Sequence, residues 1–299
     1  MSGQRRSVLV TGAARGIGEA CVARLARAGF HVFAGVRSDA DGAKLASEHG
    51  EAVSPVRLQV TEPAEIEAAT AFVADRLGGN GLYGLVNNAG IAVGGPLEFL
   101  PLGELRRQLE VNVTGQVAVT QAALPLIRRA RGSADARAGR IVFMGSISGL
   151  SALPLTGAYG ASKHALEAIA DALRVELRPW GIEVVMIEPG SIATPIWDTS
   201  LRSATETLGP VRERMTEYYG RLIEGVRARV ERAGKGLSGQ PPDAVAAVVE
   251  RALTADRPRT RYIVGRDARI RLLLKRLLPD RALDALVSRQ LDRLADGTH

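Results

Sequence analysis

The hydrophobic positions of this chain follow two patterns that alternate over most of its 299 residues. Short apolar, β-branched runs are typical of buried strands, whereas longer segments with apolar residues every three or four positions are typical of helices. Seven strands are predicted, over Ser7–Thr11, His31–Val36, Val56–Val60, Tyr83–Asn87, Arg140–Gly145, Ile182–Ile187 and Arg261–Val264. Helices are predicted near Gly16–Ala28, Ala64–Leu77, Leu102–Arg129 and Tyr159–Pro179.

This alternation predicts βαβ units, and therefore an α/β fold with a doubly wound parallel sheet of about seven strands. Right-handed crossovers place helices on both faces of such a sheet. We expect one domain over residues 1–265, because nothing in the first 190 residues suggests a boundary. The small, polar segment Arg131–Gly139 predicts a surface loop within it.

The pattern changes after Thr194, where helical spacing continues through a long insertion that is broken at Ala233–Asp243. Ligands of doubly wound folds bind beyond the carboxyl ends of the strands, so a helical lid over residues 195–240 would cover the site. Packing against the body or a partner subunit is the alternative. The apolar side chains of this segment, which would contact either the substrate or the protein surface, include Trp197, Tyr218 and Tyr219.

The last segment, Arg269–Leu294, is typical of two basic, leucine-rich amphipathic helices separated near Pro279. We treat residues 266–299 as a C-terminal extension. Peripheral membrane contact is one interpretation of such helices. We favour docking over the substrate cleft or onto a neighbouring subunit, because the second helix carries acidic residues and only a narrow leucine stripe.

Composition excludes several classes of protein. The chain is 46% hydrophobic and can bury a large core, and its single cysteine, Cys21, fits core packing in a reducing compartment. We expect a cytoplasmic protein, because no apolar run reaches the length of a membrane span and the N-terminus lacks a signal-peptide core. The net charge of +7 is dispersed and aromatic residues make up only 4%, so nucleic-acid binding is not expected.

A glycine-rich turn links the first predicted strand to the first helix. Gly12, Gly16 and Gly18 stand in this turn. Glycine allows a sharp turn and lets a pyrophosphate approach the helix N-terminus, where free amides and the helix dipole favour anions. In this strand–turn–helix context the turn predicts dinucleotide binding.

Tyr159 and Lys163 lie one turn apart on a predicted helix, so their side chains can converge on one point. The spacing alone also occurs by chance. Together with five other motifs, however, the pair resembles the short-chain dehydrogenase/reductase family in order and spacing. The motifs are Thr11-Gly12-x-x-x-Gly16-x-Gly18, NNAG at Asn87–Gly90, Asn112 in VNVTG, Ser146 in GSISG, Tyr159-x-x-x-Lys163, and PGSIATP at Pro189–Pro195.

The resemblance covers Ser7–Pro195 and implies a Rossmann-type, NAD(P)-binding catalytic domain. The strand HVFAGVR and the extended tail are most similar to hydroxysteroid and retinol dehydrogenases within the family. Relatives commonly pair through two long central helices, which implies a homodimer or homotetramer.

The resemblance also implies roles for individual residues. Tyr159 would exchange a proton with the substrate oxygen, which Ser146 would hold, and Lys163 would bind the nicotinamide ribose. Asn112 would distort its helix and hold a water that leads to Lys163. The plainer alternatives are a turn-capping serine at Ser146 and a satisfied polar helix residue at Asn112.

Cofactor contacts are implied along both sides of the expected cleft. Asn87–Gly90 would line the adenosine and ribose side and Gly190–Thr194 the nicotinamide side. The expected cofactor-binding residues are Gly12, Arg15, Gly16, Ile17, Gly18, Arg37, Gln59, Val60, Asn88, Ala89, Gly90, Tyr159, Lys163, Pro189, Gly190, Ile192 and Thr194. No cluster suits zinc, so no metal is expected.

The chemistry of alcohol–ketone interconversion explains why a phenol would stand beside an ammonium. Free tyrosine has a pKa near ~10, too high for a base at neutral pH. A unit charge about 4 Å away, at an effective dielectric of ~20, supplies about 4 kcal/mol, enough to lower that pKa by roughly 3 units. The sequence therefore predicts that Lys163 lowers the pKa of Tyr159.

The end of the second strand favours NADP(H) over NAD(H). Relatives that prefer NAD usually carry an acid where this chain has Val36, and Arg37 follows it. Arg37, assisted by Arg15, could pair with a 2′-phosphate. Gln59 stands where relatives commonly carry an aspartate that contacts adenine, so altered adenine contacts are expected.

The expected function is an NAD(P)(H)-dependent oxidoreductase that interconverts a secondary alcohol and a ketone, or a primary alcohol and an aldehyde, on a hydrophobic small molecule. A ketoreductase of carrier-bound 3-oxoacyl or polyketide groups is one alternative. A cofactor-binding redox sensor without turnover is another, against which the intact Asn112–Ser146–Tyr159–Lys163 set argues.

Overall fold

A computed structural model describes residues 5–130, 139–234 and 239–297, and its centre is one parallel sheet. The strand order is β3-β2-β1-β4-β5-β6-β7, which confirms the predicted doubly wound α/β fold. The strands are β1 (Ser7–Val10), β2 (His31–Val36), β3 (Val53–Arg57), β4 (Gly84–Asn87), β5 (Arg140–Met144), β6 (Glu183–Pro189) and β7 (Arg261–Val264).

Strand β3 is the one strand whose predicted position, Val56–Val60, was wrong. Its register with β2 pairs Val32 with Val53 and Val36 with Arg57. Pro55 lies inside this strand, although proline is disfavoured within strands. Because β3 is an edge strand, a proline without an amide proton is tolerated there.

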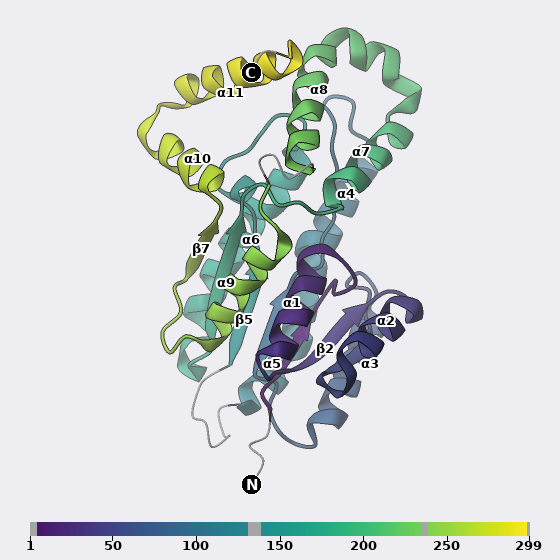
Figure 1. The fold of residues 1–299 in the computed structure, drawn as a ribbon, viewed down its shortest axis with the longest axis vertical. Coiled ribbons are helices and arrows are strands. Elements are labelled where there is room, and N and C mark those ends of the chain that lie inside the picture. The colour runs from purple at the N-terminus through teal and green to yellow at the C-terminus, as the bar shows by residue number, and fades with distance from the viewer. Residues whose placement is uncertain (1–4, 131–138, 235–238, 298–299) are drawn as a thin grey trace.

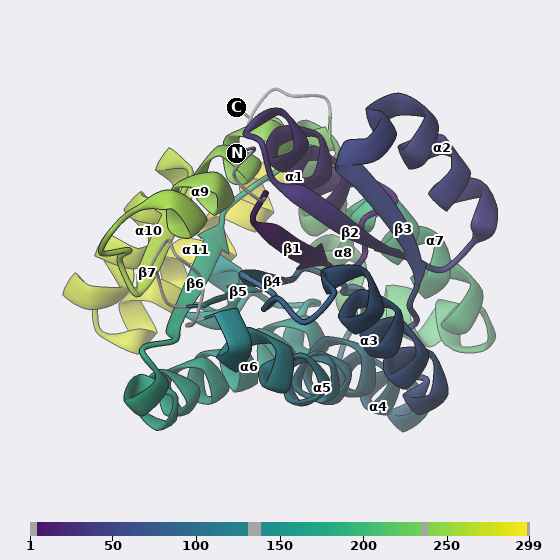
Figure 2. The same cartoon turned by 90° about the horizontal axis from the view of Figure 1, so that it is seen from below.

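Helices cover both faces of the sheet (Figure 2). One face carries α1 (Gly16–Arg27), α2 (Asp39–His49) and α9 (Pro242–Thr254), and the other α3 (Pro63–Leu77), α5 (Gly115–Arg129) and α6 (Gly157–Glu176). Successive strand residues point to opposite faces. In β1, for example, Val8 and Val10 pack in the first layer and Leu9 in the second.

Helix α2 was not predicted, because its sequence is polar and carries little apolar periodicity. Only Gly42 and Leu45 are buried in it. Its start is fixed by a cap, since the Ser38 hydroxyl accepts the backbone N–H of Asp41 at 3.2 Å.

The long helix predicted over Leu102–Arg129 is interrupted. It consists of α4 (Leu102–Leu109), a π-helical turn over Glu110–Thr114, and α5. Such turns insert one extra residue into a helix and redirect the residues around it. Asn112 lies in the middle of this turn, as the resemblance implied for a helix-distorting residue.

A helical segment lies above the carboxyl ends of the strands (Figure 1). It contains α7 (Ile196–Thr207) and α8 (Arg212–Gly234), and we call it the lid. Two helices follow β7, namely α10 (Arg266–Leu277) and α11 (Asp280–Ala295). The predicted loop Arg131–Gly139 and the predicted break Ala233–Asp243 lie in part outside the described residues, at 131–138 and 235–238.

Helix α11 docks onto α8 of the same chain. A Cβ at Gly225 would lie 2.4 Å from the carbonyl oxygen of Leu291, so the missing side chain lets the two backbones meet. Arg221 pairs with Asp292 and Asp296 at 3.0 and 2.8 Å. The acidic residues of α11, which were the reason to expect docking, therefore contact α8 of the same chain.

Helix α10 is more open to solvent. Ile270, Leu273 and Leu277 are each more than half exposed, at 56%, 55% and 69%. Over the residues that the structure describes, no helix is both long and apolar enough to span a bilayer.

Candidate active site

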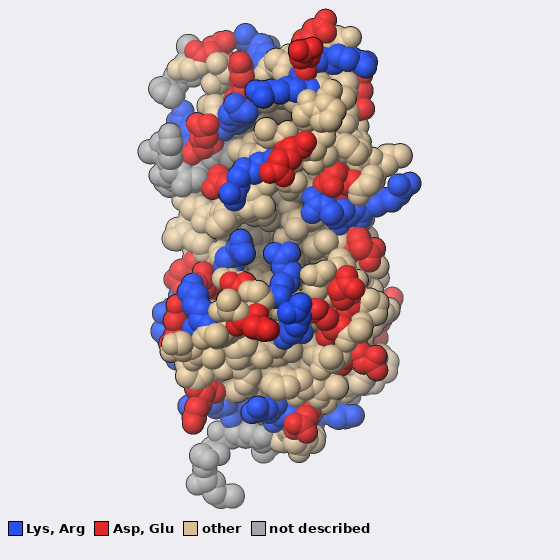
Figure 3. Space-filling model, turned by 90° about the vertical axis from the view of Figure 1, so that its right-hand side faces the viewer, with Lys and Arg blue, Asp and Glu red and all other residues tan. Residues whose placement is uncertain are grey.

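A cleft of about 640 Å³ lies at the carboxyl ends of the central strands, and residues of α7 line one side of it. Figure 3 shows a hollow across the middle of one face of the molecule, with basic side chains near its edge. Residues far apart in the sequence line the cleft. All the predicted cofactor-binding residues do so, and among the predicted catalytic residues Ser146, Tyr159 and Lys163 do.

The glycine turn after β1 forms one wall of the cleft. Gly12 and Gly16 adopt φ values of +63° and +61°, a region that residues with a side chain rarely adopt. A Cβ at Gly18 would lie only 2.1 Å from the carbonyl oxygen of Gly12. No side chain caps the first amides of α1, which begins in this wall. The arrangement fits a dinucleotide, because uncapped helix amides beside bare glycines suit a pyrophosphate.

The NNAG motif braces this turn. The Thr11 hydroxyl accepts the backbone N–H groups of Asn88 and Ala89 at 3.0 and 2.9 Å. The Asn88 side-chain amide in turn donates to the carbonyl oxygens of Thr11 and Gly12. Asn87 was expected to line the cleft but does not, because its fully buried amide donates to Thr120 on α5.

Ser146 and Tyr159 meet at the inner end of the cleft. Tyr159 is only 7% exposed, and its phenol lies beside the Ser146 side chain. The Ser146 hydroxyl also accepts the N–H of Ser148 at 3.1 Å and caps the short 3₁₀ turn Ile147–Gly149. Ser146 is thus both a capping serine and a neighbour of the phenol.

Lys163 reaches the same end of the cleft from the next turn of α6. Its ammonium donates to the carbonyl oxygen of Met144 at 2.7 Å and lies 5.6 Å from the centroid of the Tyr159 ring. Burial lowers the pKa of Lys163 to about 8, although nearby Glu188 opposes this shift.

The lowered phenol pKa that the sequence predicted is not what this structure shows. Burial raises the pKa of Tyr159 to about 12, the neighbouring Ser146 side chain opposes this shift, and the charge of Glu188 adds to it. Lys163, whose ammonium donates to Met144, is not among the groups that shift this pKa. Desolvation of the phenol dominates instead.

Asn112 does not reach the cleft. Its side-chain oxygen accepts the N–H of Ile91 at 2.8 Å, and its amide donates to the carbonyl of Ile91 and to Ser162 at 2.9 and 3.1 Å. These bonds tie the π-helical turn to the segment after β4 and to α6. Gln108 makes similar bonds to Val93 and Ile91 and was not singled out in the sequence.

The outer end of the cleft carries the two predicted arginines. Arg15 and Arg37 both line it, and both are exposed. Gln59 lines it as well, with its amide donating to Glu62 at 3.3 Å. Asp41 was missed and also lines the cleft, where it accepts a bond from the Ser38 hydroxyl at 2.7 Å.

Other lining residues had no motif to mark them. They come from the π-helical turn, from α4 and from the segment after β3, none of which the hydrophobic pattern resolved. The unpredicted residues on these elements are Thr61, Arg107, Glu110 and Val111.

The lid contributes one aromatic ring to the site. Trp197 packs edge-on against Tyr159, with ring centroids 5.4 Å apart. Tyr218 and Tyr219, in contrast, pack on Phe99, and the Tyr219 hydroxyl bonds Glu98 at 2.7 Å. Only one of the three expected aromatic residues therefore reaches the cleft.

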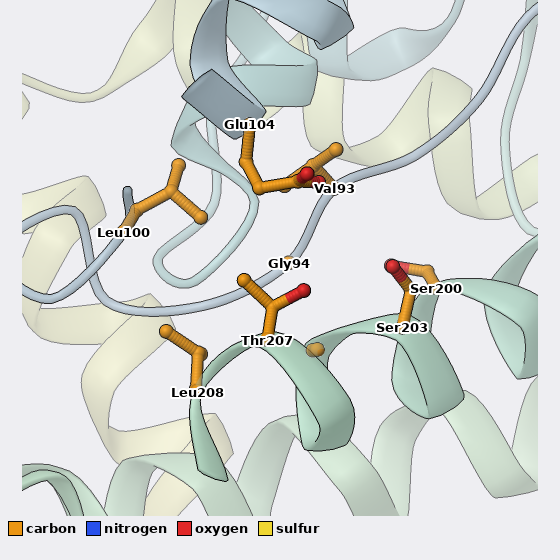
Figure 4. Close-up of a pocket in the computed structure, with 9 residues that line it drawn as sticks. Val93, Gly94, Leu100, Glu104, Ser200, Ser203, Thr207 and Leu208 are labelled. Carbon is orange, nitrogen blue, oxygen red and sulfur yellow. The ribbon is translucent and has the colours of Figure 1, made fainter. Parts of the chain in front are cut away.

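The opposite side of α7 closes against the protein body (Figure 4). Ser200, Ser203, Thr207 and Leu208 face Val93, Gly94, Leu100 and Glu104 across a narrow gap. The Gly94 position admits this approach, since a Cβ there would lie 3.3 Å from the Ser200 hydroxyl oxygen. This contact fixes the helix that carries Trp197.

Two further residues, His164 and Cys21, lie outside the motifs. His164 is exposed, as expected for the polar face of α6. Cys21 is fully buried, and its desolvated thiol has a pKa raised to about 12, which agrees with core packing.

Comparison with known proteins identifies the family. The family model for short chain dehydrogenases matches residues 6–204. This chain belongs to the short-chain dehydrogenases. The family consists of oxidoreductases with a nucleotide-binding Rossmann-type fold, as the six motifs implied.

Several relatives of this short-chain dehydrogenase match nearly its whole length. The chain is 34% identical to an NADPH-dependent 3-dehydrocapnine reductase of Ornithobacterium rhinotracheale, covering 97% of this chain and 98% of that protein. It is 35% identical to retinol dehydrogenase 5 of Mus musculus, covering 97% and 90%. A crystal structure of a short-chain dehydrogenase from Streptomyces avermitilis superposes with a TM-score of 0.71 at 26% identity, over the full length of both chains.

Proposed function

We propose that this short-chain dehydrogenase is an NAD(P)(H)-dependent oxidoreductase that interconverts an alcohol and a ketone or aldehyde on a hydrophobic small molecule. The observation that carries the proposal is that Ser146, Tyr159 and Lys163 meet in a cleft whose other wall fits a dinucleotide. A substrate oxygen that meets Ser146 and Tyr159 would lie beside the nicotinamide end of the coenzyme.

The coenzyme, when bound, supplies or accepts the hydride. The chain's own residues handle the proton. Burial raises the pKa of Tyr159, so its phenol carries the proton that the carbonyl oxygen would receive during reduction.

Ser146 and Lys163 complete the proposed chemistry. The Ser146 hydroxyl already accepts a bond from Ser148, which leaves its proton for the substrate oxygen or the phenol. Lys163 would exchange its bond to Met144 for the ribose hydroxyls of the coenzyme, and its positive charge would then favour the phenolate that remains after proton transfer. Asn112 acts through the shape of its helix and not by contact with substrate.

NADP(H) is the proposed coenzyme. Arg15 and Arg37 line the outer end of the cleft, and the strand-end position Val36 carries no acid that would repel a 2′-phosphate. The name of the NADPH-dependent relative from Ornithobacterium rhinotracheale supports the same choice.

The substrate side of the cleft supports a hydrophobic molecule. Apolar residues from β6 onward line it, among them Ile192, Pro195, Ile196 and Trp197. Binding of apolar surface in such a pocket is favourable in proportion to the area removed from water. The retinol dehydrogenase among the relatives acts, by its name, on an alcohol, which supports the proposed class.

The proposal is tested by following nicotinamide absorbance with a panel of hydrophobic ketones, aldehydes and alcohols, each with NADPH or NADH, or with their oxidised forms. We expect turnover of at least one hydrophobic carbonyl compound, faster with NADPH than with NADH. Stoichiometric coenzyme binding without turnover of any panel member, including carrier-bound 3-oxoacyl groups, would favour the redox-sensor alternative.

A further inference from the structure

A buried carboxyl group lies directly behind Ser146. Glu188, near the end of β6, is fully buried, and its Oε2 accepts the backbone N–H of Ser146 at 2.8 Å. Its other oxygen, Oε1, has no hydrogen-bond partner among the described residues. An ionised carboxylate with an unsatisfied oxygen is unfavourable in such a place.

The second carboxyl group belongs to Glu167 of α6. Glu167 is only 8% exposed, and its Oε1 likewise has no hydrogen-bond partner among the described residues. The two carboxyl groups lie close enough to interact directly. Two carboxylates have only acceptor oxygens, so a hydrogen bond between them requires a proton. One shared proton accounts for both unpartnered oxygens.

The surroundings indicate which carboxyl group is protonated. The second oxygen of Glu167 accepts a charge-assisted bond from Arg261 of β7 at 2.8 Å, and Arg261 also pairs with Asp171. Glu167 therefore has a cationic hydrogen-bond partner. Among the described residues, Glu188 has no cation bonded to it, and burial together with the charge of Glu167 raises its pKa well above the usual range.

Gly145 makes the space for this arrangement. A Cβ at Gly145 would lie 2.6 and 2.7 Å from the two carboxyl oxygens of Glu188. The chain thus carries a glycine immediately before Ser146, where any larger residue would displace the buried carboxyl group. The carboxyl group and its cradle belong to the same turn that carries Ser146.

We propose that Glu188 is a positioning residue of the active site, which holds the Ser146 backbone as the protonated half of a carboxylic acid–carboxylate pair with Glu167. In this pair Glu188 Oε1 donates its proton to Glu167 Oε1, and Glu188 Oε2 accepts the Ser146 N–H. The Ser146 hydroxyl is thereby held against Tyr159. The effect on turnover rests on the proposed oxidoreductase function, whereas the pair itself does not.

The charges that face Glu188 define what happens when the shared proton is lost. Lys163 and Tyr159 face it from α6, beside Glu167, and Arg261 approaches the pair from β7. A second negative charge would repel Glu167 and raise the pKa of Tyr159 further. We therefore expect alkaline pH to loosen the Ser146 turn.

The variant Glu188→Gln separates positioning from charge. A glutamine side chain has the same shape, donates through its amide to Glu167 and accepts from Ser146 through its carbonyl, so it imitates the protonated acid at every pH. We expect this variant to keep kcat within about 3-fold of wild type at neutral pH. Its activity at alkaline pH should decline only with the titration of Lys163, whose pKa burial lowers to about 8, and no longer with that of the carboxyl pair. Glu188→Ala should lower kcat at least 10-fold with coenzyme affinity nearly unchanged. Glu176→Gln, an exposed position on α6, is the control.

Infrared difference spectroscopy detects the shared proton without any turnover. Wild type at neutral pH should show the carbonyl band of a buried carboxylic acid, which shifts in heavy water and disappears in Glu188→Gln. Glu167→Gln should also remove it, because its amide can donate to an ionised Glu188. Glu176→Gln should keep the band. A band that is absent from wild type would overturn the proposal.

The pH dependence of the free energy of unfolding is a second way to detect the shared proton. An acid whose pKa is raised on folding keeps a proton that the unfolded chain releases near the usual glutamate pKa of 4.5. Its stabilising contribution is full below that pH and is lost as pH rises toward the folded-state pKa. Glu188→Gln should therefore become progressively more stable than wild type as pH rises from about 4.5. A constant difference at all pH values would contradict a shared proton.

Hydrogen exchange at Ser146 tests positioning even if no substrate is found. The Ser146 amide should be protected in wild type and in Glu188→Gln, and should exchange at least 10-fold faster in folded Glu188→Ala. Equal protection in all three proteins would refute the positioning role. If the infrared and exchange results are as expected but the substrate panel is inactive, the proposed function fails and the pair stands.

Discussion

The two walls of the cleft are built in different ways. The wall formed by β1, the glycine turn and the NNAG segment is made largely of backbone, with bare glycines, uncapped amides and hydrogen bonds from Thr11 and Asn88. The wall formed by the lid consists of side chains such as Trp197 and Ile196 on a helix that packs against the body through Ser200 and Leu208. Backbone walls suit a constant ligand, whereas side-chain walls can be varied for different substrates.

The sharpest way to test the backbone wall is Gly18→Ala. A Cβ there would lie 2.1 Å from the carbonyl oxygen of Gly12, which belongs to the backbone and cannot easily move. Overpacking of this kind costs roughly 3 kcal/mol, so coenzyme affinity should fall about 100-fold. Calorimetric titration with NADPH and with NADH measures the change.

The control for this substitution is Gly103→Ala. Gly103 lies on α4 with no atom within 4 Å of an added Cβ. This variant should bind coenzyme as wild type does. If Gly18→Ala bound coenzyme equally well, the glycine turn would not be the pyrophosphate wall.

On the side-chain wall, Trp197→Ala should raise KM for hydrophobic substrates about 10-fold, because the partly buried ring removes apolar surface from water. The Kd for coenzyme should stay unchanged. Trp180→Ala is the matched control, since Trp180 stacks on Arg128 and does not line the cleft. A parallel rise in coenzyme Kd for Trp197→Ala would mean that the two walls are not independent.

The smallest expected effect lies at the outer end of the backbone wall, where a side chain selects between coenzymes. Arg37→Ala should weaken NADP(H) binding by up to about 10-fold. This loss is at the lower end of the range for a hydrogen bond to a charged group, because the arginine is exposed. Binding of NAD(H) should not change. Arg178→Ala, an exposed arginine away from the cleft, should alter neither affinity. Equal losses for both coenzymes would contradict a 2′-phosphate contact.

The same difference between the walls explains what the sequence could and could not predict. Gly12, Gly16 and Gly18 were recognisable because backbone geometry permits few residues at those positions. Thr61, Arg107 and Val111 line the cleft outside these two walls and without a motif, because many residue types suit a position that contributes a side chain. The fold could be predicted because apolar residues recur with a different spacing in strands and in helices. Strand β3 was misplaced where Pro55 lies at a sheet edge, and α2 was missed for lack of an apolar face.

Electrostatics was the least predictable part of the site. The spacing of Tyr159 and Lys163 was sufficient to predict that they meet, but the sequence could not show that Lys163 bonds Met144 or that burial dominates the phenol pKa. Glu188 and Glu167 escaped notice for the same reason. Their chemistry depends on burial and on each other, which no local motif reveals.

The most direct test of the proposed chemistry is turnover and coenzyme binding of Tyr159→Phe, with Tyr218→Phe, an exposed lid tyrosine, as the matched control. Loss of the phenolic proton donor should lower kcat by about 10²–10⁴-fold, while the Kd for NADPH stays within about 2-fold of wild type. A Tyr159→Phe protein that reduces carbonyl substrates at the wild-type rate would contradict the role assigned to this residue.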